Sequence, residues 1–132
     1  MTAVHYFPLV GAQPAGQAQA ADYHGRWLIA DDERWIDPRE CPALRSIAVE
    51  LKFGYLVLRA PGMLRMDIPL DVIEDDDSVR FSVAVDGHSV DVVDEGELAS
   101  AWISNVVGRG CSIVKVHPAS PEVHWPEDVF SV

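Results

Sequence analysis

Two cysteines are the residues of this chain best suited to covalent chemistry. Cys41 lies two positions after Arg39, and Cys111 lies two positions after Arg109. A guanidinium that stays close to a thiol lowers its pKa and makes it more reactive. We expect both cysteines to be packing residues; a thiol carrier that uses Cys41 or Cys111 is the alternative.

Histidines, serines and acidic residues form no recognised catalytic or metal-binding pattern. The chain has five histidines, at His5, His24, His88, His117 and His124. No two of them have the spacing of zinc ligands on a helix. Asp75–Asp77 lacks the glycine and the distal glutamate of a calcium loop. Ser100 and Ser104 have no candidate base one helical turn away. Because glycine-rich phosphate-binding motifs are also missing, we expect no metal site and no cofactor.

Arginine and tryptophan side chains gather in residues 23–44, which we take as the candidate site for an anion or a protein partner. Its candidate residues are Arg26, Arg34, Arg39, Trp27 and Trp35. Arg26 and Trp27 are neighbours on a predicted strand, so their side chains face opposite sides, and one of them can line the mouth of a barrel. Exposed arginines with a purely structural role are the alternative.

The net charge restricts the classes of partner. The chain has 132 residues and a formal net charge of −11, and residues 71–97 hold ten acids but only one base, Arg80. This charge repels nucleic acid and anionic lipid, so we expect neither as a partner. The N-terminus has no signal peptide or spanning run, which favours a cytoplasmic protein without a disulfide. An exported form with one disulfide is the alternative, and we expect a monomer or weak oligomer.

Short alternating runs separated by turn residues predict a mostly β fold. Strands are expected at residues 4–10, 17–20, 26–31, 34–36, 47–52, 55–60, 64–70, 80–85, 88–93 and 112–116. The turns Phe53-Gly54 and Asp86-Gly87 are typical of two-residue hairpins, which need positive φ angles. So many short strands predict a small closed or partly open β-barrel, because closure removes exposed edges.

One amphipathic helix is expected near the C-terminal end. Asp94 and Glu97 have the spacing of a capping box, which predicts a helix over residues 95–107. Its expected apolar stripe consists of Leu98, Ala101, Trp102 and Val106. We place the domain at residues 1–117. Residues 118–132 hold three prolines and are expected to be a flexible tail, although Val123, Trp125 and Phe130 could dock.

Several of these segments occur in the order of a known family. Five segments are similar to the motifs of this family. In chain order they are Tyr6-Phe7-Pro8-Leu9, residues 26–31, residues 37–44, the helix at 101–108 and the strand at 112–116. The chain thus resembles the MOSC N-terminal β-barrel domain, which precedes the MOSC domain in molybdenum cofactor sulfurase and in the mitochondrial amidoxime-reducing component. The resemblance spans about residues 4–117 and implies the barrel fold.

The departures from the family pattern concern its cofactor contacts. In the family a Lys-Ser pair contacts an anionic pterin cofactor, and here Val10-Gly11 stands in its place. His24 and Gly25 stand where the family has Asp and Arg, and only Arg26 remains, at a variable position. The resemblance therefore implies a barrel that lacks two phosphate-binding charges. We also expect it to be free-standing, without the MOSC domain whose cysteine ligates molybdenum.

Two functional readings follow. We expect a non-catalytic binding or interaction module that is not an enzyme on its own. The alternative is a subunit that acts in trans, with a separately encoded MOSC-domain protein, in a molybdenum-cofactor-dependent oxidoreductase or sulfur-transfer protein. Only that alternative involves the molybdenum cofactor, and it places the contact near Arg26, Arg39 and the C-terminal tail.

Overall fold

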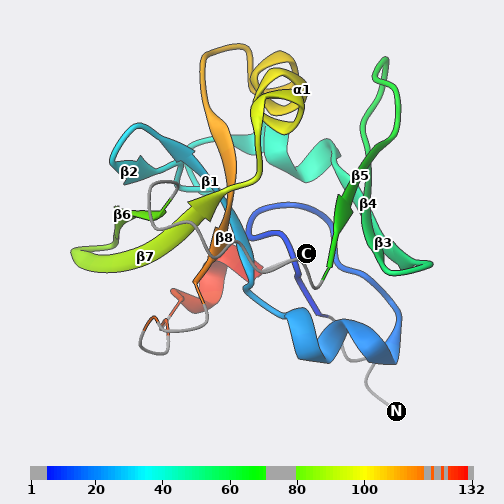
Figure 1. Cartoon of the computed structure of the whole chain (residues 1–132), viewed down its shortest axis with the longest axis horizontal. Coiled ribbons are helices and arrows are strands. Elements are labelled where there is room, and N and C mark those ends of the chain that lie inside the picture. Colours follow the sequence, from blue (N-terminus) through cyan, green and yellow to red (C-terminus); the bar gives the residue numbers. More distant parts are fainter. Residues whose placement is uncertain (1–5, 71–79, 118–119, 121–122, 124, 131–132) are drawn as a thin grey trace.

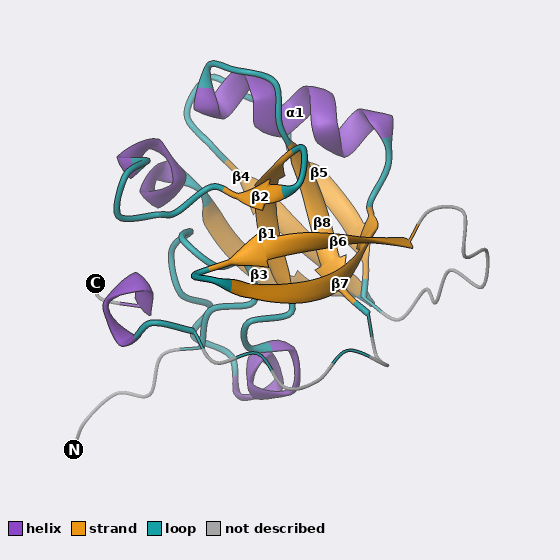
Figure 2. Ribbon diagram, turned by 90° about the vertical axis from the view of Figure 1, so that its left-hand side faces the viewer, coloured by secondary structure: helices purple, strands orange, loops and turns teal. Residues whose placement is uncertain are grey.

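A computed structural model of the chain describes residues 6–70, 80–117, 120, 123 and 125–130. Five strands form a closed barrel, and three more form a second sheet beside it (Figure 1). The long helix α1 (Glu97–Val107) lies across one end of this arrangement (Figure 2). The expected mostly β barrel with one helix near the C-terminal end is thereby confirmed. The expected acidic loop at residues 74–77 lies outside the described residues.

The barrel has the strand order β1-β2-β6-β7-β8. The strands are β1 (Trp27–Asp31), β2 (Arg34–Trp35), β6 (Arg80–Val85), β7 (His88–Asp94) and β8 (Ser112–Val116). The barrel contains two hairpins, β1 with β2 and β6 with β7, and the second is the one predicted from Asp86-Gly87. The barrel closes where β1 pairs antiparallel with β8 and where β2 pairs in parallel with β6. These two long-range pairings have no local signal in the sequence.

Strand β1 is buried on both faces. Trp27 and Ile29 belong to the larger core, between the barrel and the second sheet, whereas Leu28 and Ala30 belong to the core inside the barrel. Successive side chains of a strand point to opposite sides, so the unbroken apolar run Trp27–Ala30 supplies both cores. The inner core is otherwise rich in valine, with Val83, Val85, Val90, Val92 and Val114.

The second sheet consists of β3 (Ala48–Lys52), β4 (Tyr55–Arg59) and β5 (Met66–Pro69) in that order. The predicted turn between β3 and β4 is confirmed, because Phe53 and Gly54 have φ angles of 52° and 81°. One face of this sheet supplies Leu51, Leu56 and Ile68 to the larger core. This sheet therefore covers the barrel on one side.

The helix begins later than predicted. Its N-cap is Gly96 without a side-chain cap, and Asp94 instead accepts a hydrogen bond from the Gly96 N–H at 2.7 Å. The capping box was therefore a wrong prediction. The predicted stripe was also partly wrong, because Leu98 is 81% exposed while Ala99 and Ile103 are buried beside Trp102. The helix ends at Gly108, whose φ of 87° is typical of a C-terminal glycine.

The N-terminal segments differ from the predicted strands. In place of a strand over residues 4–10, the described part makes only two isolated bridges, Tyr6 with Ala15 and Leu9 with Trp27. The expected strand at residues 17–20 is wrong, since the 3-10 helix η1 (Ala18–Tyr23) occupies most of it. A second 3-10 helix, η2 (Pro42–Ser46), follows the loop after β2. Pro42 at its first position suits such a start.

A short 3-10 helix, η4 (Glu127–Phe130), lies near the C-terminus. Val129 is buried in the core inside the barrel, and Trp125 and Phe130 pack against that core. This is the docked arrangement that the sequence left open for Trp125 and Phe130. Among the described residues, no helix has both the length and the apolarity to cross a membrane.

Candidate functional site

A polar cleft of about 580 Å³ lies beside the β1–β2 hairpin. Its walls come from this hairpin, the loop after β2, the turn between β6 and β7, and the C-terminal end of α1. Its charged lining residues are Asp31, Arg34, Asp37, Glu40, Asp86 and Arg109. Trp35, Ile36 and Val107 supply apolar surface to the same cleft. The cleft thus combines both signs of charge with an apolar floor.

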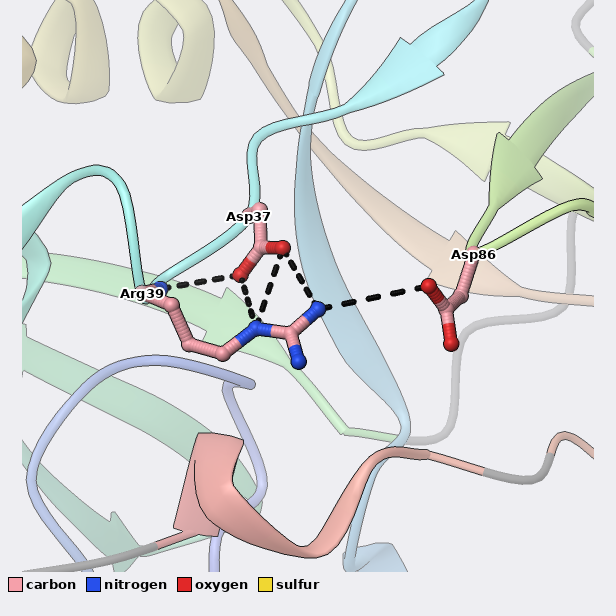
Figure 3. A network of polar contacts seen from close by, with 3 residues as sticks. All are labelled: Asp37, Arg39 and Asp86. Atoms are coloured by element: carbon pink, nitrogen blue, oxygen red, sulfur yellow. Dashed lines mark hydrogen bonds and ion pairs between the residues drawn. The ribbon is translucent and has the colours of Figure 1, made fainter.

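An ion pair between Asp37 and Arg39 stands at the edge of this cleft (Figure 3). Arg39 donates from Nε to Asp37 Oδ1 at 2.9 Å and from Nη2 to Oδ2 at 2.7 Å. The backbone N–H of Arg39 also donates to Asp37 Oδ1 at 2.9 Å, across the rigid Pro38. Hydrogen bonding from the Arg39 side chain lowers the pKa of Asp37. The Asp86 carboxylate lies 4.0 Å from the same guanidinium.

Two arginines at the cleft, Arg39 and Arg109, are paired with carboxylates. Arg109 Nη1 lies 3.8 Å from Asp31 Oδ2, and Arg39 is paired with Asp37 and Asp86. Paired in this way, these two guanidiniums present less net positive charge to an incoming anion than two unpaired cations would. The cleft therefore carries charges of both signs rather than a purely positive surface.

The two cysteines differ in their surroundings. Cys41 is half-buried and lines the cleft. Cys111 is buried, and burial raises the pKa of its thiol. The Ser104 hydroxyl, 3.1 Å from the Cys111 backbone, accepts its N–H and donates to its carbonyl. Cys111 is placed as a packing residue, and only Cys41 faces the cleft.

The predicted candidates do not form one cluster. Arg26 lies just before the first residue of β1. Arg34 lies opposite Asp31, the last residue of β1, in the strand pairing of β1 with β2. The length of β1, about 16 Å, therefore separates the two arginines. Trp27 is fully buried, and its Nε1 donates to Glu95 Oε2 at 3.1 Å. The structure brings Arg34, Trp35, Arg39 and Cys41 to the cleft and leaves Arg26, Trp27 and Cys111 outside it.

Sequence reasoning missed the acidic side of the cleft. Asp37 and Asp86 belong to a loop and a hairpin turn that are 49 positions apart, and only the β2–β6 pairing brings them together. One local signal was available, because Asp-Pro-Arg places a carboxylate and a guanidinium on one tight turn. Asp86 was recognised only as a turn residue.

A second region is formed by residues 125–130, which we call the C-terminal clasp. The ring of Trp125 lies 5.6 Å from that of Trp35. The ring of Phe130 lies 4.6 Å from that of His24 and 5.3 Å from that of Phe7. The clasp therefore covers the surface near the start of β1.

Two glycines let neighbouring side chains approach the backbone closely. Gly25 has a φ of +68°, and a Cβ built there would lie 2.5 Å from Trp125 Nε1. Gly11 has a φ of +99°, and its Cβ would lie 2.8 Å from a side-chain carbon of Pro38. Any other residue is disfavoured at both positions by the backbone conformation as well as by the neighbours. No larger side chain fits at either position without movement of its neighbour.

His24 connects the clasp to the N-terminal segment. Its Nδ1 accepts a hydrogen bond from the Phe7 N–H at 2.9 Å, which requires the neutral ring with its proton on Nε2. Burial lowers the pKa of His24 and so favours the same neutral form. Within the described ranges, no group of three or more His, Cys, Asp or Glu residues is placed to hold a metal ion.

Known proteins with similar sequences support the barrel fold described above. The family model for the MOSC N-terminal beta barrel domain matches residues 2–110. The chain is 32% identical over 107 residues to human molybdenum cofactor sulfurase and 28% identical over 102 residues to that of Danio rerio. These matches cover 77% and 73% of this chain, which spans about 12% of the length of either relative.

A solved structure is also similar. The solution structure of a Bordetella bronchiseptica protein shares 56% sequence identity with this chain, with a TM-score of 0.81. The match covers 96% of this chain and 98% of that one. The family model and the relatives confirm the resemblance drawn from the sequence motifs. The chain belongs to the MOSC N-terminal beta barrel domain family.

Proposed function

We propose that this chain is a non-catalytic binding module that recognises a protein partner through its polar cleft. One observation carries the proposal: the positions at which the family resemblance implies cofactor contacts are closed by apolar packing. Val10, which replaces the family's lysine, is 1% exposed in the core inside the barrel. Gly25, which replaces its arginine, is covered by Trp125.

The residues present do not fit the anionic pterin group. A phosphate contact needs a cation whose head group reaches the ligand. A charged side chain at position 10 would be buried among valines, which costs several kcal/mol or more. A side chain at position 25 would collide with the Trp125 indole. The chain's own residues thus support a scaffold without that cofactor.

The cleft has the composition of a protein-contact surface. Its lining includes Trp35, and also Arg34 and Arg109 together with four carboxylates. Tryptophan and arginine are the residues that most often dominate binding energy at protein interfaces. Alternating charges at the rim would select a partner whose own charges are complementary.

The test is capture of partners by the tagged full chain from its own cells, with variants of the cleft. R34A combined with R109A is expected to reduce recovery of a stoichiometric partner at least tenfold. R59A is the matched control, because Arg59 is an exposed arginine paired with Glu50 on the second sheet, away from the cleft. Equal recovery with the cleft variant and with wild type would remove the cleft as the contact.

The second candidate is a subunit that acts in trans with a separately encoded MOSC-domain protein. The similarity to molybdenum cofactor sulfurase, of which this chain matches only a small part, favours it. In that arrangement the partner would hold the molybdenum cofactor. Native mass spectrometry of the gently isolated complex separates the two proposals. A partner with a MOSC domain, or an adduct of pterin mass, would support the second, whereas a partner of another kind without such an adduct would support the first.

A further inference from the structure

The clasp fits into a recess whose shape suits an aromatic ring. The floor of this recess is the bare backbone of Gly25, with Trp35 on one side. Because the ideal Cβ of residue 25 would come within 2.5 Å of Trp125 Nε1, the indole uses the space that a side chain would otherwise fill. A second contact lies nearby, where Phe130 packs on His24. The recess thus receives two aromatic rings from positions five residues apart.

Side-chain packing holds the clasp in place. Among the described residues, the clasp makes one backbone hydrogen bond apart from those within helices and strands. It joins two residues of the clasp itself, from the Val129 N–H to the Pro126 carbonyl at 3.2 Å. Pro126 has no N–H to donate, and the described part of the clasp adds no strand to the barrel. The contacts that hold the clasp are therefore made by its side chains, and another segment with the same side chains could make them too.

We propose that this recess is a peptide-binding site for a partner segment that carries tryptophan and, five residues later, phenylalanine. In this chain its own clasp fills the site and competes with the partner. The clasp supplies the pattern itself: Trp125 covers Gly25, Val129 enters the core inside the barrel, and Phe130 covers His24. The site is separate from the charged lining of the cleft, and the proposal does not depend on the function proposed for that cleft.

Competition within one chain has a measurable consequence. A tethered segment acts at an effective concentration in the millimolar range, so an added peptide should bind weakly to the wild-type chain. Removal of the two aromatic rings of the clasp should open the recess to the same peptide. The site would then be detected as a gain of binding in a variant of the full chain.

The experiment uses a synthetic peptide of residues 123–132 and isothermal titration calorimetry. The full chain with W125A and F130A is expected to bind this peptide 1:1 and at least tenfold more tightly than wild type does. Adding G25A to this variant should abolish the gain, because the Cβ fills the place of the indole. Adding G62A is the matched control, since Gly62 has a similar φ of +75° and nothing within 4 Å of its Cβ.

Three outcomes would overturn the proposal. These are no binding to the folded double variant, equal binding to wild type and the double variant, or equal binding after addition of G25A and of G62A. Circular dichroism and a thermal transition establish folding before each titration. Should the double variant fail to fold, W125A alone is used, and it must bind the peptide more tightly than wild type for the proposal to stand.

Discussion

The cleft and the recess under the clasp lie on the same small protein but are built in different ways. The cleft is lined by charged side chains, and Arg39 at its edge joins the lining residues Asp37 and Asp86 in a chain of ion pairs. The recess is apolar and closed, and its shape depends on one missing Cβ, at Gly25. Exposed ion pairs tolerate substitution, whereas close packing against backbone does not.

Trp35 belongs to both regions. It lines the cleft, and its ring packs against Trp125 of the clasp. A change in the recess can therefore reach the cleft through the Trp35 side chain. We therefore expect substitutions in the recess to change stability more than substitutions at the ion pairs do. Four predictions test this contrast.

G25A should have the largest effect on stability. The substitution combines backbone strain at a positive φ with a collision against Trp125, so a loss of about 2–4 kcal/mol in the free energy of unfolding is expected. G62A, with strain alone, should lose about 1 kcal/mol. Urea denaturation followed by fluorescence measures both. Equal losses would show that the clasp does not press on residue 25.

Thiol reactivity should separate the two cysteines. Cys41 faces the cleft, whereas Cys111 is buried and its pKa is raised by burial. A thiol–disulfide reagent at neutral pH is expected to modify Cys41 at least tenfold faster than Cys111, since only the thiolate reacts. The single variants C41S and C111S allow each rate to be measured alone. Similar rates would contradict the assignment of Cys111 to the core.

His24 should make the clasp region sensitive to acid. Its folded pKa lies below the unfolded value of 6.5, so its stabilising contribution is complete above that pH and is lost as pH falls through the folded pKa. H24N keeps an acceptor for the Phe7 N–H but does not titrate. The variant is therefore expected to lose less stability than wild type between pH 7 and pH 5 in denaturation experiments. Parallel curves for the two proteins would exclude a role for His24.

D37N should have a smaller effect than the three changes above. It keeps an oxygen for the Arg39 N–H but removes the charge, and exposed ion pairs contribute less than about 1 kcal/mol. Because Arg39 lowers the pKa of Asp37, its contribution is present above the unfolded value of 3.8 and is lost as pH falls through the folded pKa.

The matched control for D37N is D86N, at the longer distance of 4.0 Å from Arg39, and it should be closer still to neutral. Denaturation at low and high salt measures both substitutions. A loss for D37N as large as that for G25A would break the contrast between the two regions.

Local signals in the sequence predicted much of the fold. Phe53-Gly54 and Asp86-Gly87 each adopt the positive φ angles that a two-residue turn needs, and the strand at Ser112–Val116 was placed correctly. Local patterns failed where a distant partner decides the structure. Glu95 was expected in the helix, but it lies ahead of it and accepts the Trp27 indole N–H, a contact that spans 68 positions.

The sites were less predictable than the fold. Their residues lie far apart in the chain, and no local sequence pattern predicts the pairing of β2 with β6. Gly25 could be recognised as a departure from the family motif, but not as the floor of a recess, because its covering residue lies 100 positions later. Arg26 and Arg34 were grouped because they are close in sequence, although the whole of strand β1 lies between them.

The pairing of β1 with β8 also determines when the barrel can be completed. Trp27 pairs with Lys115, so β1 lacks its β8 partner until most of the chain has been synthesised. At about 5–20 residues per second, roughly 4–17 s pass before the C-terminal strand follows. The second sheet, whose strands are neighbours in sequence, can form during that time. During synthesis, the apolar run Trp27–Ala30 would thus be exposed and prone to aggregation, which makes it a candidate binding segment for chaperones.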